Sequence, residues 1–360
     1  MPSKHPAEAD LLQAIAQTRS ARVRQLLRAT PELARGWKPI MDAAFTGWAE
    51  GVRLLLAAGA DANQVSPNSH RHTPLVRAVE WKKTNSRTSG HREVVHALLD
   101  AGADSLQRGG VHQWTPLAHA LMSDEADLAR LLVPVHALDL PHAAMAYDVV
   151  LVRKLLRRQG APGDVRDAVG RNALHYLCAS GLHRRQGSSA ALAIAALLLD
   201  AGADVDAQQT NLIEEGWAGT PLWWAVAWQQ HYGLAEHLLH AGAAAQPALF
   251  AAAVDGDEGT LKLLLAHGAR LEHRIEGRTV LMDIMRFKRP RHLALLLAAG
   301  ADARAADADG NTALHFAVQS AVRPEAVALL VQHGADPSCR NAAGASPRSL
   351  AKQLGRKLPL

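Results

Sequence analysis

The sequence has 360 residues, and its 39 Lys and Arg exceed its 34 Asp and Glu by only five, too small an excess for a dedicated nucleic-acid binder. Apolar residues make up 48% and charged residues 20%, as in folded proteins, which excludes a disordered chain. No apolar run approaches the roughly 18 residues of a membrane span and no secretory signal opens the sequence, so we expect a cytoplasmic globular protein.

The first elements expected along the chain are two helices over residues 8–34, which we interpret as an N-terminal cap. From residue 38 onward two short motifs alternate. One is a Thr-Pro-Leu segment, as in TPLVRAV at 73–79, and the other is a Leu-Leu-x-x-Gly-Ala-Asp segment, as in LLAAGAD at 55–61 and LLDAGAD at 198–204. Copies of the first motif, some of them loose, start at 38, 73, 115, 139, 172, 220, 246, 279, 312 and 346. Such self-similarity is typical of a repeat architecture.

Each unit predicts two helices. Thr followed by Pro is a helix N-cap followed by a residue tolerated at the first helical position. After a turn such as Asp255–Asp257 comes an amphipathic stretch, GTLKLLLAHG at 259–268, whose Leu265 we place on the stripe that packs against the neighbouring unit. Gly268 supplies the left-handed conformation that ends this second helix. Neither helix can bury its apolar face alone, so the units must stack.

At these positions the sequence resembles the ankyrin repeat family, whose consensus runs Thr-Pro-Leu-His-x-Ala, then two helices, then Leu-Leu-x-x-Gly-Ala-Asp. The resemblance covers nearly the whole chain. It implies an all-α solenoid of paired antiparallel helices joined by finger-like β-turn loops. We expect a single domain over 1–360, with about nine internal repeats over 38–345 and a C-terminal capping helix over 346–357.

Several segments depart from this pattern. Two insertions, Lys82–Gly90 and Leu182–Ser189, lengthen the turn between the two helices of a unit, and two others, around Gln64–His72 and Gln208–Gly219, enlarge the finger loops. A solenoid tolerates such insertions because each unit contacts only its neighbours. Over residues 131–140 the Gly-Ala-Asp motif is missing and Pro134 should end a helix early, so we expect irregular stacking between 115 and 170.

The sequence contains no recognisable catalytic or cofactor motif. GxGxxG at a helix start, GxxxxGK[ST], HExxH and GxSxG are all absent, and no Cys and His spacing suits zinc. Cys178 replaces a small apolar residue of a first helix, where a buried inert thiol is expected, and Cys339 falls in a finger loop as an exposed bystander. We therefore predict no catalytic residue, no metal and no cofactor.

Histidines are numerous, at 19, and two of them have a structural interpretation. His175 and His315 fill the Thr-Pro-Leu-His position, where the resemblance implies that the imidazole links neighbouring turns by hydrogen bonds. His70 and His72 flank Arg71 in an inserted finger and could bind a metal as a pair, but no third ligand is evident.

Aromatic residues indicate a binding surface. The resemblance implies one variable concave face, formed by finger tips and the inner side of the first helices. Aligning each unit on its Thr places on this face the residue before the Thr and the residues seven and eight positions after it. Since Trp is a common anchor of binding hot spots, we take the following as candidate partner-binding residues: Trp37, Phe45, Trp81, Trp114, Trp228, Arg278, Arg286 and Phe287. The alternative is that several Trp pack against neighbouring fingers, and of Trp223 and Trp224 we expect at least one to do so.

Basic residues gather near the same face in the units that start at 73 and 279. Such charge usually forms a solvated surface. The alternative is that these residues bind an acidic segment of a partner protein. The residues concerned are Lys82, Lys83, Arg278, Arg286, Lys288, Arg289 and Arg291.

Together these features predict a non-enzymatic scaffold that binds another protein through its concave surface and inserted loops. The alternative is binding of nucleic acid or another acidic ligand through the basic face, which would weaken steeply with salt. We expect a monomer that binds no membrane, and nucleic acid is the less favoured partner. The Ala-, Arg- and Leu-rich composition suggests a bacterial source and leaves open a cytoplasmic partner, a neutralised toxin or a host target.

Overall fold

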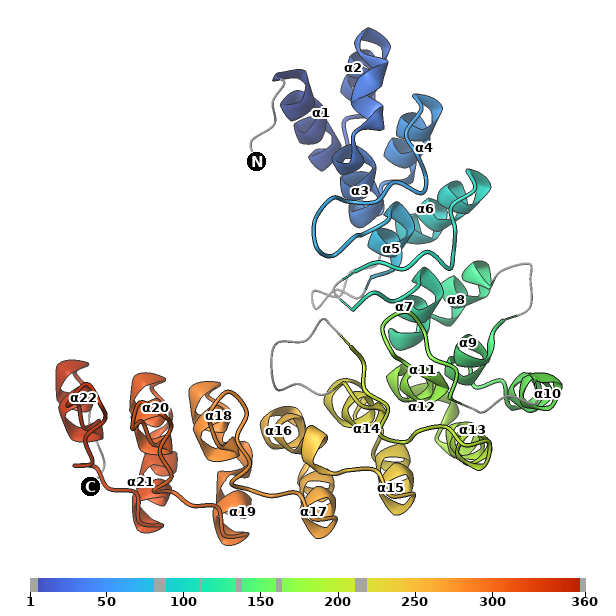
Figure 1. Cartoon of the computed structure of the whole chain (residues 1–360). Helices are drawn as coiled ribbons and strands as arrows, with labels where there is room; N and C mark the ends of the chain where they lie inside the picture. Colours follow the sequence, from blue (N-terminus) through green and yellow to red (C-terminus); the bar gives the residue numbers. More distant parts are fainter. Residues whose placement is uncertain are drawn as a thin grey trace. The chain divides into compact units, whose positions relative to one another are not determined.

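The computed structural model describes residues 6–80, 89–110, 112–133, 138–159, 164–210 and 219–356. Within these ranges the regular structure is helical, with isolated bridges such as that between Gly109 and Trp114 in the loops. The helices form antiparallel pairs, which confirms the predicted all-α solenoid class (Figure 1). Most of the insertion Lys82–Gly90, up to residue 88, and also Pro134 lie outside the described residues.

Contacts divide the chain into two compact units. Unit 1 comprises Met1–Gln159 and Ser180–Gly187, and unit 2 comprises Gly160–Ala179 and Ser188–Leu360. None of the helices in the described ranges is long and apolar enough to cross a membrane.

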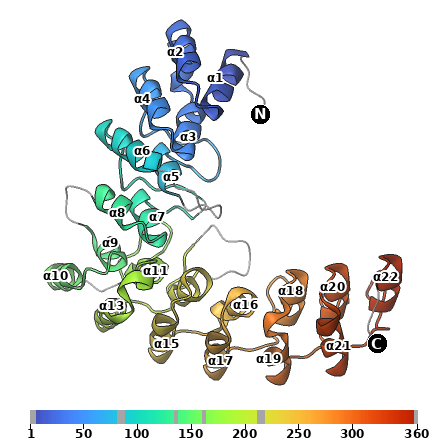
Figure 2. The ribbon, with the colours of Figure 1, turned by 180° about the vertical axis from the view of Figure 1, so that it is seen from behind.

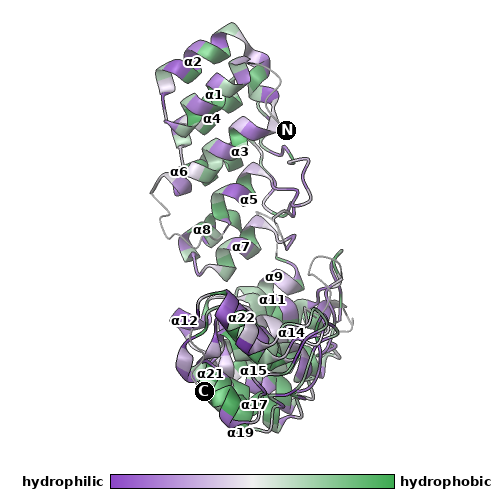
Figure 3. Ribbon diagram, turned by 90° about the vertical axis from the view of Figure 1, so that its left-hand side faces the viewer, coloured by the Kyte–Doolittle hydropathy of each residue, from purple (hydrophilic) through white to green (hydrophobic). Residues whose placement is uncertain are grey.

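In unit 1, helix pairs stack in series. The first helices α1, α3, α5, α7 and α9 contact one another in that order, and the second helices α2, α4, α6 and α8 do the same. Figure 3 shows loops between pairs gathered along one side of this stack, largely coloured as hydrophilic. The elements are α1 (Pro6–Ala16), α2 (Ser20–Ala29), η1 (Pro31–Arg35), α3 (Trp37–Thr46), α4 (Ala49–Ala57), α5 (Pro74–Val79), α6 (Ser89–Asp100), α7 (Pro116–Met122), α8 (Ala126–Leu132), α9 (Leu140–Met145), α10 (Val149–Gln159) and α12 (His183–Gln186).

Unit 2 repeats the same arrangement. Its first helices run from α11 through α14, α16, α18 and α20 to α22, each in contact with the next, and its second helices lie beside them as a parallel row (Figure 2). The elements are α11 (Ala173–Ala179), α13 (Ser189–Asp200), α14 (Pro221–Trp223), η2 (Trp224–Gln229), α15 (Tyr232–His240), α16 (Gln246–Asp255), α17 (Glu258–Ala266), α18 (Val280–Arg286), η3 (Pro290–His292), α19 (Leu293–Ala298), α20 (Ala313–Gln319), α21 (Pro324–Gln332) and α22 (Pro347–Gln353).

Helix ends follow the local sequence signals. The hydroxyls of Thr73 and Thr115 accept hydrogen bonds from the backbone N–H groups of Val76 (3.2 Å) and Ala118 (3.1 Å), as N-caps do, and proline follows each of them. Just after α17, Gly268 has a φ of 87°, so the predicted left-handed end of this helix is confirmed.

The core of each stack is a leucine stripe. Nearly every second helix has at least one leucine with no exposed surface, and the leucines at equivalent positions are Leu55, Leu98, Leu132, Leu198, Leu238, Leu264, Leu296 and Leu330. In α17 the fully buried residues are Leu261 and Leu264, whereas Leu265 is only partly buried. The prediction that placed Leu265 on the packed stripe was therefore wrong by one residue, because a run of three leucines does not identify which of them faces the neighbouring helix.

Buried histidines link consecutive first helices, as predicted. The Nε2 atom of His175 lies 2.8 Å from the carbonyl oxygen of Gly219, and that of His315 lies 3.2 Å from the carbonyl oxygen of Ala345. Each therefore ties the start of its own helix to the residue that precedes the next helix. Burial lowers the pKa of His175 to about 4, so this link is made by a neutral imidazole.

One first helix contains an extra residue. In three units that start with Thr, at 115, 279 and 312, the turn after the first helix contains a residue with positive φ. This residue lies nine positions after the Thr, at Asp124, Lys288 and Ala321. After Thr220 it is Gln230, with a φ of 54°, ten positions on. The extra residue falls where the chain forms the π-helix η2, whose wider turn accommodates it. Trp228 thus occupies the place of Arg286, two residues before the turn, and not the place of Phe287 as the alignment on Thr predicts.

Candidate functional site

The predicted binding residues lie at opposite ends of the first helices. Trp37, Trp114 and Arg278 are at the N-terminal ends, where the finger loops arrive. The others that the structure describes are at the C-terminal ends, before the turn to the second helix, and these are Phe45, Trp228, Arg286 and Phe287. Trp81 lies outside the described residues. A seven-residue helix such as α18 is about 10 Å long, so the backbones of the two groups lie about one helix length apart.

In unit 1 the aromatic residues are at least partly covered. Trp37 begins α3 and is half-buried, and so is Phe45, over whose ring the guanidinium carbon of Arg77 lies 3.9 Å from the centroid. Such a cation–π contact covers one face of the ring and fixes its position. Phe45 and Trp37 therefore present part of their surface to solvent.

Trp114 is fully buried, so the expectation that it is accessible was wrong. Its backbone bridges Gly109 across the finger loop, with Gly109 N–H donating to the Trp114 carbonyl at 3.0 Å. The residue before the Thr is thus the last residue of a small hairpin, and its side chain is covered by the stack. Trp114 is a packing residue.

In unit 2 three large aromatic side chains are exposed by more than a third, Trp228, Tyr232 and Phe287, and the first and last of these are predicted binding residues. Trp228 is 37% and Phe287 41% exposed. The Trp228 ring lies 5.7 Å from that of Trp224, which is fully buried, while Trp223 is 5% exposed. This confirms that at least one of the paired Trp223 and Trp224 is a packing residue, and both are.

Arg278 and Arg286 meet at one buried carboxylate. The Asp283 side chain accepts hydrogen bonds from the Nε atoms of Arg278 (2.8 Å) and Arg286 (3.1 Å). Arg278 is mostly buried and also pairs with Glu276, so it supports the loop around it. Arg286 is 41% exposed, and its guanidinium carbon lies 4.2 Å from the Phe287 ring centroid, which places a charge beside an exposed aromatic ring.

The turns of unit 2 are joined into a continuous edge, which we call the turn edge and define as residues 228–231, 255–257, 286–292 and 320–323. Each turn is hydrogen-bonded to the next. The Gln230 amide nitrogen donates to the Asp255 carbonyl (3.1 Å), His292 Nε2 lies 3.0 Å from the Gly256 carbonyl, and the Ser320 hydroxyl donates to the Arg286 carbonyl (3.1 Å). Trp228, Arg286 and Phe287 all belong to this edge.

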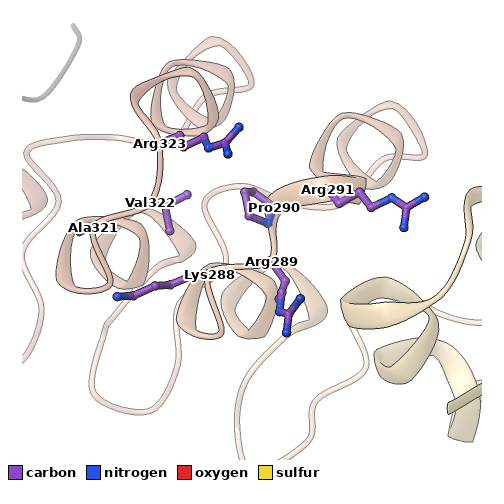
Figure 4. A pocket seen from close by; sticks show the side chains of 7 residues that line it. All are labelled: Lys288, Arg289, Pro290, Arg291, Ala321, Val322 and Arg323. Atoms are coloured by element: carbon purple, nitrogen blue, oxygen red, sulfur yellow. The ribbon is translucent and has the colours of Figure 1, made fainter. Parts of the chain in front are cut away.

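A basic groove lies between the last two turns of this edge. It has a volume of about 580 Å³. Its lining residues are Lys288, Arg289, Pro290, Arg291, Ala321, Val322 and Arg323 (Figure 4). The sequence pointed to Lys288, Arg289 and Arg291 but missed Arg323, because Arg323 belongs to the following repeat and only stacking brings it to the same place. The predicted Lys82 and Lys83 lie outside the described residues.

The histidines considered as a metal pair have other contacts. The Nε2 atom of His72 lies 3.0 Å from a carboxylate oxygen of Glu80, which also pairs with Arg77 at 3.2 Å. Burial alone would raise the pKa of Glu80, but the hydrogen bond to His72 and the nearby positive charges lower it to about 2. In the described part of the chain no three potential ligands are grouped to hold a metal ion.

The two cysteines lie in different surroundings. Cys178 is fully buried, as predicted, and this burial raises the pKa of its thiol. Cys339 is partly exposed in a finger loop.

Comparison with known families identifies the repeats. The model "Ankyrin repeats (3 copies)" matches residues 11–108 and 249–341, and the model "Ankyrin repeat" matches residues 169–210. No curated protein matches the sequence.

Two solved structures are similar in part. The human ASB11 ankyrin repeat domain is 24% identical, with a TM-score of 0.47, over 59% of this chain and 91% of that chain. A chain from the complex of the predatory endopeptidase Bd0816 of Bdellovibrio bacteriovorus with immunity protein Bd3460 is 22% identical, with a TM-score of 0.44, over 54% of this chain and 98% of that chain.

Proposed function

Because the chain belongs to the ankyrin repeat family, we propose that it is a non-enzymatic scaffold that binds another protein. The ankyrin repeat fold is typically a binding scaffold, and stacked repeats offer an extended surface to a partner. Fold alone does not choose the partner, so the proposal depends on the side chains that the repeats present.

The observation that carries the proposal is the exposure of Trp228 and Phe287 on the turn edge of unit 2. Large aromatic side chains are costly to leave in water, and Trp, Tyr and Arg dominate binding hot spots. Trp228 packs on the buried Trp224, and Phe287 carries Arg286 beside its ring, so both aromatic rings are held in place before a partner arrives. Such pre-organisation reduces the entropy lost on binding.

The binding surface we propose therefore centres on Trp228, Arg286 and Phe287. In unit 1, Phe45 is equivalent to Trp228, since it also lies two residues before the residue with positive φ that ends its helix, Gly47. Phe45 and Trp37 are secondary candidates, and Trp81 remains one from sequence alone. Arg278 supports the loop beside this surface, and Trp114 is a packing residue of unit 1.

Other parts of the proposal rest on composition. We take the protein to be bacterial, cytoplasmic and monomeric, with no catalytic activity of its own. The buried Cys178 and the hydrogen-bonded His175 support the last point, since neither is placed to attack a substrate.

Nucleic-acid binding is the second candidate, and the basic groove is the observation that favours it. The two functions differ in their response to salt. Binding to mixed DNA or RNA would weaken steeply as salt is raised, whereas an interface anchored by aromatic residues would change little.

The experiment is a pull-down from native cell extract, followed by affinity measurements on the partner that it identifies. Trp228→Ala and Phe287→Ala should each weaken binding by about thirtyfold, the effect of removing a hot-spot residue worth about 2 kcal/mol. Leu354→Ala is the matched control, because Leu354 is 46% exposed and lies outside the turn edge. Normal binding by both aromatic variants would contradict the proposed surface.

A further inference from the structure

The groove between the last two turns of unit 2 is preformed. The backbone makes the same two hydrogen bonds in both turns. Lys288 N–H donates to Met285 and Arg289 N–H to Ile284 in one turn, and Ala321 N–H donates to Val318 and Val322 N–H to Ala317 in the other, all at 2.8–3.2 Å. The Ser320 hydroxyl donates to the Arg286 carbonyl and so fixes the two turns relative to each other. Backbone hydrogen bonds thus fix the shape of each turn, and the short Ser320 side chain links one turn to the other.

The groove carries positive charge without a matching number of acids. Its lining includes four cationic side chains and no carboxylate. Arg289 lies 3.6 Å from Asp255, and Arg291 interacts electrostatically with Glu258, both on the side of the preceding helix pair. Among the described residues, neither Lys288 nor Arg323 forms an ion pair. Glu325, two positions after Arg323, does not line the groove.

Between these two cations the surface is apolar. Figure 4 shows Lys288 and Arg323 projecting from neighbouring turns, with Pro290 and Val322 between them. Phe287, the residue before Lys288, adds an exposed ring at the edge. A phosphate backbone would use the cations alone, while a peptide can use both the charges and the apolar floor. A volume near 580 Å³ is also within the range of pockets that hold small ligands or a few residues of a peptide.

We infer that this groove receives an acidic segment of the partner protein, with carboxylates against Lys288 and Arg323 and an apolar side chain on Pro290 and Val322. The inference rests on the proposed protein-binding function and adds the chemistry of the segment that is recognised. Opposite charges placed across an interface select the partner and its register, and they speed the encounter.

The test uses a defined probe on the full chain. A fluorescein-labelled peptide in which glutamate alternates with leucine and serine is titrated with the protein, and the same peptide with glutamine in place of glutamate is the matched probe. We expect the glutamate peptide to bind and the glutamine peptide to bind at least about tenfold more weakly, because each exposed ion pair contributes up to about 1 kcal/mol.

The double variant Lys288→Glu, Arg323→Glu should lose about tenfold or more in affinity for the glutamate peptide. Its control is Arg270→Glu, Lys352→Glu, which makes the same change in net charge at two exposed cations of unit 2 outside the groove. Circular dichroism establishes that both variants are folded. Equal loss in the two double variants, equal binding of the two peptides, or no binding at all would overturn the inference.

A single-stranded oligonucleotide with the same net charge as the glutamate peptide tests whether the groove binds nucleic acid instead. If it displaces the peptide at similar concentrations, the groove recognises negative charge as such and the acidic-peptide inference fails. Failure of the proposed function has a different signature. It appears when Trp228→Ala and Phe287→Ala bind the partner from the pull-down normally, whatever the result of the peptide titration.

Discussion

The indole ring of Trp228 packs against that of Trp224 with the ring centroids 5.7 Å apart and the planes inclined by 58°, and of the two only Trp228 reaches solvent. The inner ring belongs to the core of η2 and the outer ring to the surface. One pair of residues thus joins the packing of the stack to the surface that we propose for the partner.

This pair predicts opposite outcomes for two similar substitutions. Trp224→Ala should lower the free energy of unfolding by about 3–5 kcal/mol, because it removes a fully buried ring and leaves a cavity. Trp228→Ala should cost much less stability, because more than a third of its surface is already exposed. Urea titrations of both variants measure the difference, and equal destabilisation would show that Trp228 is a packing residue.

The corrected register of α17 gives a second prediction. Leu264→Ala should lower the free energy of unfolding by about 2–5 kcal/mol, and Leu265→Ala by clearly less, because only Leu264 has no exposed surface. The comparison needs no external control, since the two leucines are adjacent and the substitution is the same. A larger loss of unfolding free energy in Leu265→Ala than in Leu264→Ala would show that Leu265 is the packed residue, as the sequence predicted.

The same variant also tests whether 1–360 is one domain, as the sequence predicts. Because stability in a solenoid is close to a sum of local terms, Leu264→Ala should open unit 2 more readily than unit 1. Hydrogen exchange followed separately in α3 and α16 measures this. Equal loss of protection in both helices would mean that the whole chain unfolds as one cooperative domain.

A third prediction concerns pH. Burial holds the pKa of His175 at about 4, below the ordinary value of 6.5, so between these values the unfolded chain binds a proton that the folded chain does not. Stability from this group is therefore complete above about pH 6.5 and is lost as the pH falls toward 4. His119 in unit 1, whose burial also lowers its pKa to about 4, acts in the same direction.

Urea midpoints measured at a series of pH values over this window test the prediction. His175→Gln should flatten the fall in stability, because glutamine can still donate a hydrogen bond but does not titrate. An unchanged slope in His175→Gln would show that the link between His175 and Gly219 does not account for this part of the acid sensitivity.

A fourth prediction concerns the insertion after α5. Because α6 begins at Ser89, inside the expected insertion Lys82–Gly90, the deletion is limited to residues 82–88, which leaves α5 and α6 whole. Far-ultraviolet circular dichroism and the melting temperature should then stay close to those of the parent. A collapse of both signals would make the insertion a structural element. Retained fold with weaker partner binding would add it to the recognition surface.

The sequence predicted the helix pairs well because each unit contains its own signals. Thr73 with its proline, Gly268 after the leucines, and His175 before the next finger act through local geometry or through the adjacent repeat, and all three behave as expected. Their interactions span only one repeat, so a pattern read along the chain captures them.

The candidate surface was less predictable, because it depends on which way a side chain faces. Trp114 and Trp228 were both expected on the binding face, yet Trp114 is fully buried in its finger hairpin whereas Trp228 is exposed near the end of η2. Arg323 joined the basic groove only because two turns stack side by side. The motif of one repeat does not predict which side chains of the next repeat will lie beside it in the stack.

The extra residue in η2 has a consequence for how this surface can change. In a regular helix one added residue rotates every later side chain of that helix by about 100°. The π-helix confines the shift to a few residues, and Leu238 in α15 is still fully buried. Insertion or deletion of a single residue at this point therefore exchanges which side chain is exposed at the turn edge while the leucine stripe stays aligned. The stack can vary its exposed residue by length as well as by substitution.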